Sequence, residues 1–288
     1  MIWELLLEPF AAFGFMRRAL IGCIAISVGA TPIGVFLMLR RMSLTGDAMA
    51  HAILPGAAVG YLIAGLSLTA MTVGGLIAGM AVALFSGFVS RVTQLREDAS
   101  LAAFYLISLA AGVLLVSMRG RNVDLMHVLF GTVLALDDAA LILLCAIASI
   151  TLIVLAVLFR PLVLECADPQ FLRSVSGLST VTHFTFLALA VLNLVGGFQA
   201  LGTLMIVGIM ILPAAAARFW ATSIGSMIAV AVLVAIGASV AGLLLSYHHG
   251  LPSGPAIILS TGVAYCLSLV FGRVGGLVRT LPKTNANA

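Results

Sequence analysis

Charged residues divide this chain into long apolar stretches. A helix that crosses a bilayer needs roughly 20 consecutive apolar residues, so the spacing of the charges predicts where the spans lie. The charge-free stretches are residues 19–39, 48–90, 99–118, 139–159, 174–217 and 219–272. Three of them are long enough for two spans each, which gives about eight or nine spans in total. The pattern therefore predicts an all-α, polytopic transmembrane helix bundle that forms one domain over residues 1–288.

The composition agrees with a membrane protein. Hydrophobic residues make up 62% of the chain and charged residues only 8%, whereas a soluble domain carries about 25% charged residues. The net charge of +4 does not indicate nucleic-acid binding, because the arginines are scattered at the ends of the apolar stretches instead of forming a stripe. The four cysteines are far apart and include no Cys-x-x-Cys pair, so they say little about redox chemistry.

The distribution of Lys and Arg predicts the orientation, because these residues accumulate in cytoplasmic loops. When about nine spans alternate, one side collects Arg40, Arg41, Arg91, Arg96, Arg160, Arg173, Arg218, Arg273, Arg279 and Lys283. The other side holds Arg17, Arg18, Arg119 and Arg121. This split places the C-terminus in the cytoplasm and the N-terminus outside. An alternative for residues 1–15 is an interfacial amphipathic helix. An extra or missing span there would change only the side on which the N-terminus lies.

Two segments between spans are not simple loops. Residues 122–138 contain an uncharged run that is too short to cross a bilayer, which predicts a re-entrant or interfacial helix. Residues 164–179 lie on the cytoplasmic side and contain a short helix that Asp168 caps, with Pro169 at its first position and Gly177 at its end. The side chains predicted to be exposed are those of Phe171, Leu172, Arg173 and Val175. An apolar and basic surface of this kind fits a groove on a soluble partner, although a helix lying on the lipid surface is the alternative.

Asp47 and His51 are the strongest candidates for chemistry. Their spacing of four residues puts both side chains on one face of a helix, with Cβ atoms about 5 to 6 Å apart. Polar groups of this kind are costly within a membrane span, so they face the bundle interior and usually have a function there. A carboxylate oxygen and an imidazole nitrogen together suit a divalent transition metal. The alternative is that Asp47 only caps a helix that begins there while His51 bonds to a carbonyl group.

The other candidate ligands are weaker. Asp124 and His127 are three residues apart and could form a second ligand pair, but they lie in a partly exposed segment where helix capping explains them better. His248 and His249 stand before the loop at residues 250–255 and would collect metal at the outer mouth if they have a function. His183 is interpreted as a lone structural histidine near the start of a span.

Pro213 interrupts a hydrogen bond inside a span, and the small residues that follow it permit close packing or a hinge.

Motifs of common enzyme classes are absent from the sequence. Lys283 is the only lysine and follows Pro282, so the chain has no Gly-x-x-x-x-Gly-Lys phosphate loop. A His-Glu-x-x-His zinc motif and a Gly-x-Ser-x-Gly nucleophile motif are absent as well. The sequence therefore predicts a protein that is not itself an enzyme.

The stretch LRRMSLTGDAMAHAILPG, residues 39–56, resembles the signature of the permease subunits of bacterial zinc and manganese ABC importers. Further matches follow in the same order: EDASLAAFYL (97–106), DLMHVLFG (124–131), ADPQFLRSVSG (167–177), GTLMIVGIMILPAAAA (202–217) and GLPSGPAIIL (250–259). The resemblance covers nearly the whole chain. It implies the type II ABC importer permease fold in a bacterial cell membrane, the inner membrane in Gram-negative cells.

The resemblance also implies partners and roles. Such permeases form homodimers with a translocation path at or near the interface, bind two cytoplasmic ATPase subunits that use ATP, and receive metal from an extracytoplasmic solute-binding protein. The positions of Asp47 and His51 match residues that handle the metal, and the helix at about 165–178 matches the coupling helix that fits the ATPase. Gln170 departs from the family, where an acidic residue is frequent at this position.

The hypothesis from the sequence is ATP-driven import of a divalent metal by alternating access. The transported ion is expected to be zinc or manganese, and ferrous iron is a further candidate. The first rival is a standalone metal carrier driven by an ion gradient, which would need no ATPase. The second rival is a membrane enzyme that uses bound zinc, which would need a third ligand and a polar catalytic group.

Overall fold

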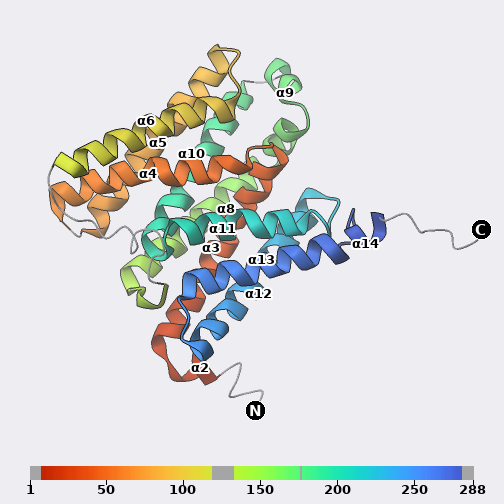
Figure 1. Cartoon of the computed structure of the whole chain (residues 1–288). Coiled ribbons are helices and arrows are strands. Elements are labelled where there is room, and N and C mark those ends of the chain that lie inside the picture. The colour runs from red at the N-terminus through yellow and green to blue at the C-terminus, as the bar shows by residue number, and fades with distance from the viewer. Residues whose placement is uncertain (1–7, 66, 119–132, 176, 281–288) are drawn as a thin grey trace, which may run out of the picture.

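A computed structural model describes residues 8–65, 67–118, 133–175 and 177–280, and the regular structure of these residues is entirely helical (Figure 1). The helices are α2 (Glu8–Ala12), α3 (Gly14–Leu39), α4 (Ser43–Ala64), α5 (Leu68–Val92), α6 (Glu97–Met118), η1 (Val133–Ala135), α8 (Asp138–Ala167), α9 (Pro169–Val175), α10 (Leu178–Leu201), α11 (Thr203–Ala217), α12 (Ile224–His249), α13 (Ser253–Phe271) and α14 (Leu277–Thr280). The prediction of an all-α transmembrane bundle is confirmed.

The number of complete spans is at the lower end of the expected eight or nine. Within the described residues, eight helices are long and apolar enough to cross a membrane: α3, α4, α5, α6, α8, α10, α12 and α13. The ninth apolar helix, α11, has 15 residues, and at 1.5 Å per residue it covers about 22 Å of a hydrocarbon core about 30 Å thick. Gly202, with a φ of 85°, ends α10 and leaves only this short segment for α11. The stretch 174–217 therefore holds one full span and one short helix.

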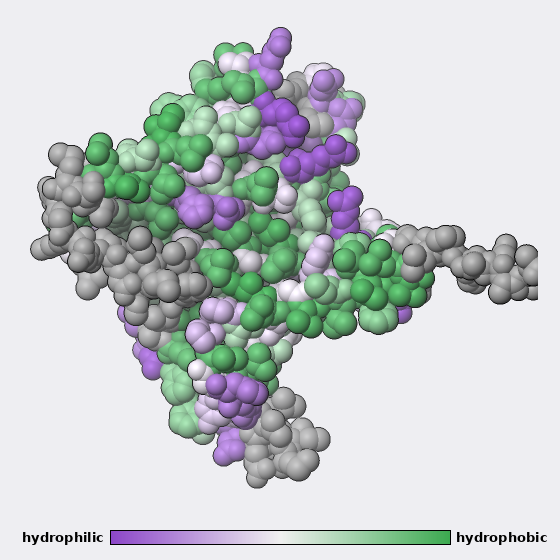
Figure 2. Space-filling model, in the orientation of Figure 1, coloured by the Kyte–Doolittle hydropathy of each residue, from purple (hydrophilic) through white to green (hydrophobic). Residues whose placement is uncertain are grey.

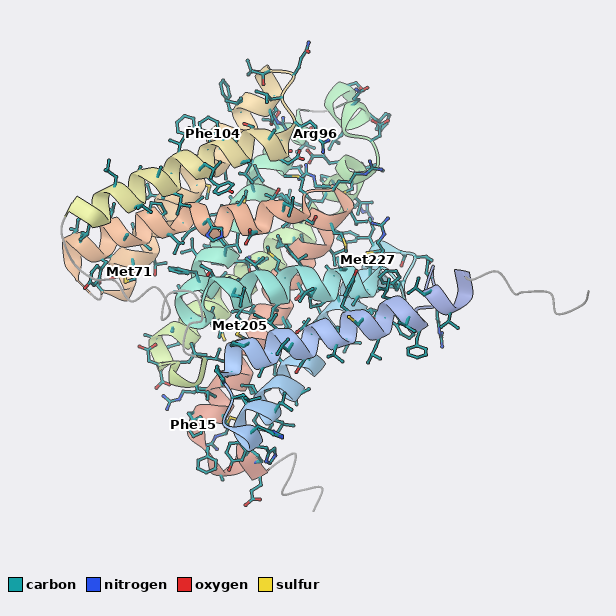
Figure 3. The ribbon with its side chains drawn as sticks, viewed as in Figure 1. Phe15, Met71, Arg96, Phe104, Met205 and Met227 are labelled. Carbon is teal, nitrogen blue, oxygen red and sulfur yellow. The ribbon has the colours of Figure 1, made fainter. Side chains whose placement is uncertain are left out.

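Helix α3 lies at the centre of the bundle and packs against α8, α10, α11 and α12. Helices α4, α5 and α6 form a second group beside it, and α10 contacts members of both groups (Figure 1). Met205 of α11 is buried near the middle of the bundle, whereas Phe104 of the outer α6 is only partly buried (Figure 3). Hydrophobic residues cover much of the face seen in Figure 2, as expected for a surface in lipid.

Helices α4 and α5 approach each other closely because glycines face each other in their contact. A methyl group added to Gly56 would lie under 3.0 Å from the backbone of Gly74, and one added to Gly60 would meet the backbone of Ala70 equally closely. Small residues allow helix backbones in a membrane to make close van der Waals contact. The two helices therefore form a rigid pair.

The crossing of α3 and α11 is built around Pro213. A proline in a helix leaves the carbonyl group of the residue four positions earlier without its backbone donor, and here that residue is Ile209. The hydroxyl of Thr31 on α3 donates a hydrogen bond to this carbonyl oxygen at 3.3 Å. Both Thr31 and Pro213 are buried. The hydroxyl thus replaces the hydrogen bond that the proline removes, as neighbouring helices do for membrane prolines.

This arrangement makes a testable prediction about Thr31. Thr31→Val is expected to lower the thermal stability of the purified protein, but much less in a Pro213→Ala background, where a backbone N–H again serves the Ile209 carbonyl group. The coupling energy is expected to be about 0.6 kcal/mol, and at most about 1.7 kcal/mol. Thr261→Val is the control, because the Thr261 hydroxyl bonds only within its own helix, to the Ile257 carbonyl. Additive effects of the two substitutions in a double-mutant cycle would refute this role of Thr31.

Candidate transport site

Asp47 and His51 lie on α4 as one pair. A turn with Arg41 in the left-handed conformation (φ 59°) ends α3, and α4 begins at Ser43 with Met42 at the capping position. Asp47 is therefore inside the helix and does not cap it, so that alternative interpretation is wrong. The Asp47 Oδ1 atom lies 3.8 Å from His51 Nε2. The two side chains share one face, as their spacing predicts.

The pair is open on the surface of the single chain. The side chain of Asp47 is 64% exposed and that of His51 is 35% exposed. The His51 ring stacks on Tyr105 of α6, with 6.4 Å between ring centroids, and the Ser108 hydroxyl of α6 donates to the carbonyl oxygen of Ala52 at 3.3 Å. Helix α6 therefore holds one side of the imidazole while the carboxylate faces outward.

One chain supplies only part of a metal coordination sphere at this point. Within the described residues, no group of three or more His, Cys, Asp or Glu side chains is arranged to hold a metal ion. Two ligands leave several positions of a divalent transition metal open. An ion at the Asp47–His51 pair would therefore need ligands from water or from another chain.

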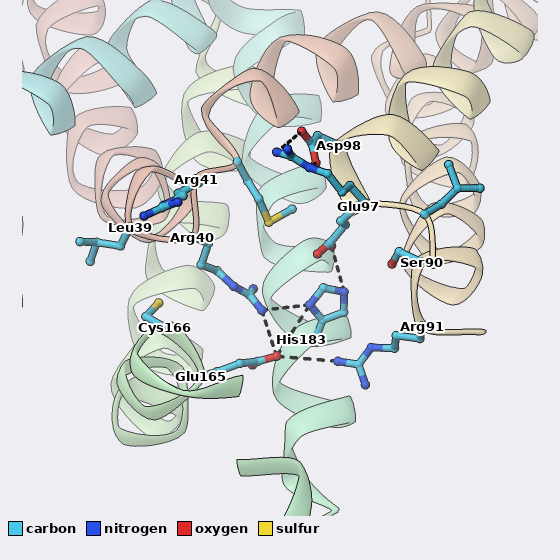
Figure 4. Close-up of a pocket in the computed structure, with 13 residues that line it drawn as sticks. Leu39, Arg40, Arg41, Ser90, Arg91, Glu97, Asp98, Glu165, Cys166 and His183 are labelled. Carbon is cyan, nitrogen blue, oxygen red and sulfur yellow. Dashed lines mark hydrogen bonds and ion pairs between the residues drawn. The ribbon is translucent and has the colours of Figure 1, made fainter. Parts of the chain in front are cut away.

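A cluster of buried and partly buried polar side chains, which the sequence pattern did not predict, lies at the end of the bundle near α9. We call Arg40, Arg91, Glu97, Glu165 and His183 the charge cluster (Figure 4). Glu165 Oε1 lies 2.9 Å from Arg40 Nη2 and 3.7 Å from Arg91 Nη2, and its side chain is only 2% exposed. His183 Nε2 lies 3.1 Å from Glu97 Oε1. Arg40 stands in the turn that follows α3, and the other four side chains come from α5, α6, α8 and α10.

The two ring nitrogens of His183 lie beside different charged groups. Arg40 Nη2 lies 3.0 Å from His183 Nδ1, and an arginine can only donate a hydrogen bond. Nδ1 therefore accepts from Arg40, and Nε2 is the ring atom on the side of Glu97, 3.1 Å from its Oε1. The guanidinium groups of Arg40 and Arg91 also lie over aromatic rings of α10, at 5.0 Å from Phe186 and 5.4 Å from Phe184. The prediction that His183 is a lone histidine is wrong.

The charge cluster borders a cavity of about 450 Å³. Its lining also includes Arg41, Arg96, Asp98 and Cys166. Arg96 binds Asp98 at 3.0 Å at the exposed edge of the cavity, and Figure 4 shows Asp98 above Glu97. Residues that were interpreted from the sequence only as orientation signals at span ends therefore meet in one place.

Helix α9 begins as the sequence predicts. Asp168 Oδ1 accepts hydrogen bonds from the backbone N–H groups of Gln170 and Phe171, at 3.0 and 2.9 Å, and Pro169 is the first helical residue. The side chain of Phe171 is exposed. Leu172, however, is buried, because the helix turns this side chain toward the bundle. The prediction that Leu172 is exposed is wrong, and Leu172 holds α9 in place instead.

The remaining candidates lie apart from these sites. His248 and His249 are exposed in the last turn of α12, close to Phe13, whose ring centroid lies 5.7 Å from that of Tyr247. Asp124 and His127 lie outside the described residues. The re-entrant segment expected at 122–138 is described only from residue 133 onward, where η1 leads into α8.

Within the described residues, eight helices that can cross a membrane, a polar pair on one of them and a short capped helix between two others are the features of a polytopic membrane protein. The chain belongs to the ABC 3 transport family, whose family model matches residues 12–272. It is thus a multi-pass permease subunit of an ABC transporter, and the expected permease fold is confirmed.

Named relatives extend over nearly the whole chain. It is 32% identical to the manganese import system permease protein ScaB of Streptococcus parasanguinis, over 91% of this chain and 92% of the relative. It is 29% identical to the chelated iron transport system membrane protein YfeD of Yersinia pestis, over 95% of this chain and 91% of the relative. Among solved structures, PsaBC from Streptococcus pneumoniae in complex with Fab matches with a TM-score of 0.82 and 28% identity, over 97% of this chain and 99% of that chain.

Proposed function

We propose that this permease imports a divalent transition metal in an ATP-driven complex and that the metal binds transiently to Asp47 and His51. The observation that carries the proposal is the carboxylate–imidazole pair, with its atoms 3.8 Å apart on an open face of α4 in a permease of this family. The relatives named above support manganese or iron as cargo. We favour manganese because the ScaB relative is named as a manganese import permease and because a carboxylate ligand suits this ion.

The open face of α4 favours a symmetric dimer. Leu44, Asp47 and His51 follow one helical face, and Leu44 is 77% exposed. A second copy related by a two-fold axis would cover this apolar surface and bring a second Asp47–His51 pair to the same ion. Two carboxylates and two imidazoles would then complete most of a coordination sphere. The same contact would remove the ion from lipid.

The two ends of the bundle would bind different partners. We place this end in the cytoplasm, together with the C-terminus, because arginines gather there. Helix α9, with the exposed Phe171, would dock into a cytoplasmic ATPase subunit, one for each permease copy. A metal-binding protein would deliver the ion at the opposite end. The complex would lie in a bacterial cell membrane.

Dependence on the ATPase separates this proposal from a carrier driven by an ion gradient. Cells that express the complete complex are expected to accumulate radiolabelled manganese, and cells whose ATPase subunit lacks its phosphate-binding lysine are not. Uptake that persists with the inactive ATPase would refute ATP-driven import. Competition by unlabelled zinc and ferrous iron in the same cells would rank the cargo ions.

Docking of α9 makes a separate prediction. Phe171→Asp is expected to abolish co-purification of the ATPase subunit, because it places a charge where an apolar side chain fills a groove. Phe171→Leu is the matched control, since it keeps an apolar side chain at the same position and should retain most of the ATPase. Equal recovery of the ATPase with both variants, measured at equal permease levels, would contradict docking through this face.

A further inference from the structure

The charge cluster joins both flanks of α9 to the rest of the bundle. Glu165 precedes the cap residue Asp168 by one helical turn and lies 3.7 Å from Arg91 of α5. The same arginine donates to the Thr180 hydroxyl at 2.8 Å and to the Ser179 carbonyl oxygen at 3.4 Å, just after α9. One side chain of α5 therefore contacts the chain on both sides of α9, so a displacement of α9 acts directly on α5.

From this cluster, two connections lead to the helix that carries the metal pair. Arg40, which binds Glu165 at 2.9 Å, stands in the turn between α3 and α4, two helical turns before Asp47. Helix α5, which carries Arg91, packs closely on α4 where Gly56 faces Gly74. Movement of the cluster is therefore passed to α4 both at its beginning and along its length.

Because Glu165 is buried, its carboxylate needs a cationic partner in every state of the protein. A buried carboxylate that loses its cationic partner is strongly destabilising, and the Glu165 side chain is only 2% exposed. Its contacts with arginine must therefore be kept or exchanged whenever α9 moves. Within the described part of the chain, Glu165 Oε2 and Arg40 Nη1 are buried atoms without a hydrogen-bond partner. Together with the cavity of about 450 Å³ beside them, these atoms give the cluster room for a second arrangement.

We infer that Arg91 and Glu165 are positioning residues of the transport cycle, which couple the movement of α9 to the metal-binding face of α4. The inference rests on the proposed function, in which α9 contacts the ATPase. It assigns to the charge cluster a role distinct from folding alone. When the charge cluster is lost, ATP hydrolysis should continue but should no longer drive the change at Asp47 and His51 that moves the metal.

The test measures manganese ions imported per ATP hydrolysed, using the complete complex of permease, ATPase and metal-binding protein in proteoliposomes. Arg91→Met and Glu165→Gln are each expected to lower this ratio by about fivefold or more, since coupling between sites is typically 5- to 150-fold. Thr151→Val is the control. It removes another buried contact between α8 and α10, the 2.7 Å hydrogen bond from Asn193, but leaves the charge cluster intact, and its ratio should stay that of the wild type.

The outcomes separate the two proposals. Wild-type complex without ATP-dependent uptake would overturn the proposed function and this inference with it. The inference alone would be overturned if the wild-type complex imports manganese with ATP and the number of ions imported per ATP is unchanged in Arg91→Met and Glu165→Gln. An equal loss of this ratio in Thr151→Val would overturn it as well. If both cluster variants fail to assemble, hydrogen exchange of the wild-type complex decides. Binding of a non-hydrolysable ATP analogue should then change exchange in segments 88–92, 163–167 and 43–52 together, and a change in 43–52 without the other two would refute the coupling.

Discussion

Asp47→Asn is expected to reduce manganese uptake at least tenfold while the complex still assembles. Asparagine keeps the size of the side chain but removes the negative charge, and a neutral amide is a much weaker ligand for a divalent cation. Even residues that only support metal ligands cost about 10- to 100-fold in affinity or activity when they are changed. His51→Gln should reduce uptake in the same way. Initial rates of radiolabelled manganese uptake, normalised to permease in the membrane, measure both.

A second exposed aspartate provides the control. Asp138, at the start of α8, has a side chain that is 81% exposed and binds Arg18 at 3.3 Å, far from α4. Asp138→Asn makes the same chemical change at the other end of the bundle and should leave uptake near the wild-type rate. Similar rates for Asp47→Asn and Asp138→Asn would remove Asp47 from the transport mechanism.

Gly34→Ala is expected to cause the largest loss of stability among the substitutions considered. A methyl group on Gly34 of α3 would lie well under 3.0 Å from the backbone carbonyl oxygen of Met210 on α11. A backbone atom cannot move aside as the tip of a side chain can, so the two helices must separate. Overpacking of this kind typically costs about 1 to 3 kcal/mol and sometimes more. The thermal unfolding midpoint and the yield of folded protein should both fall.

An exposed helical glycine shows what the same substitution does without a neighbour. Gly237 lies within α12, and a methyl group there would meet no heavy atom within 4 Å. Gly237→Ala should be neutral or stabilising, because alanine favours a helix by about 0.5 to 1 kcal/mol over glycine. Equal thermal midpoints for the Gly34→Ala and Gly237→Ala variants would show that the α3–α11 contact is not as close as described.

Much of the fold follows from local rules. The spacing of charges predicted the spans because lipid requires apolar residues along a whole helix. The start of α9 was predicted because Asp168 and Pro169 act on the backbone next to them. The helical face shared by Asp47 and His51 depends only on their spacing. In each case, residues close together in the sequence determine the result.

The charge cluster could not be predicted because its members are far apart in the sequence. Arg40 and His183 are separated by 143 positions, and each alone looks like a polar residue at the end of a span. The burial of Leu172 likewise depends on how α8 and α10 hold α9, and the short α11 depends on where Gly202 ends α10. These features come from tertiary packing, which the hydrophobic pattern does not encode.

Direct binding of manganese to the purified permease tests the central claim most directly. In the absence of ATPase and binding protein, equilibrium dialysis with radiolabelled manganese is expected to show one bound ion for two chains, and the binding should be lost in both Asp47→Asn and His51→Gln. Asp138→Asn should bind as the wild type does. Undiminished binding in Asp47→Asn and His51→Gln would contradict the assignment of Asp47 and His51 as the residues that hold the transported metal.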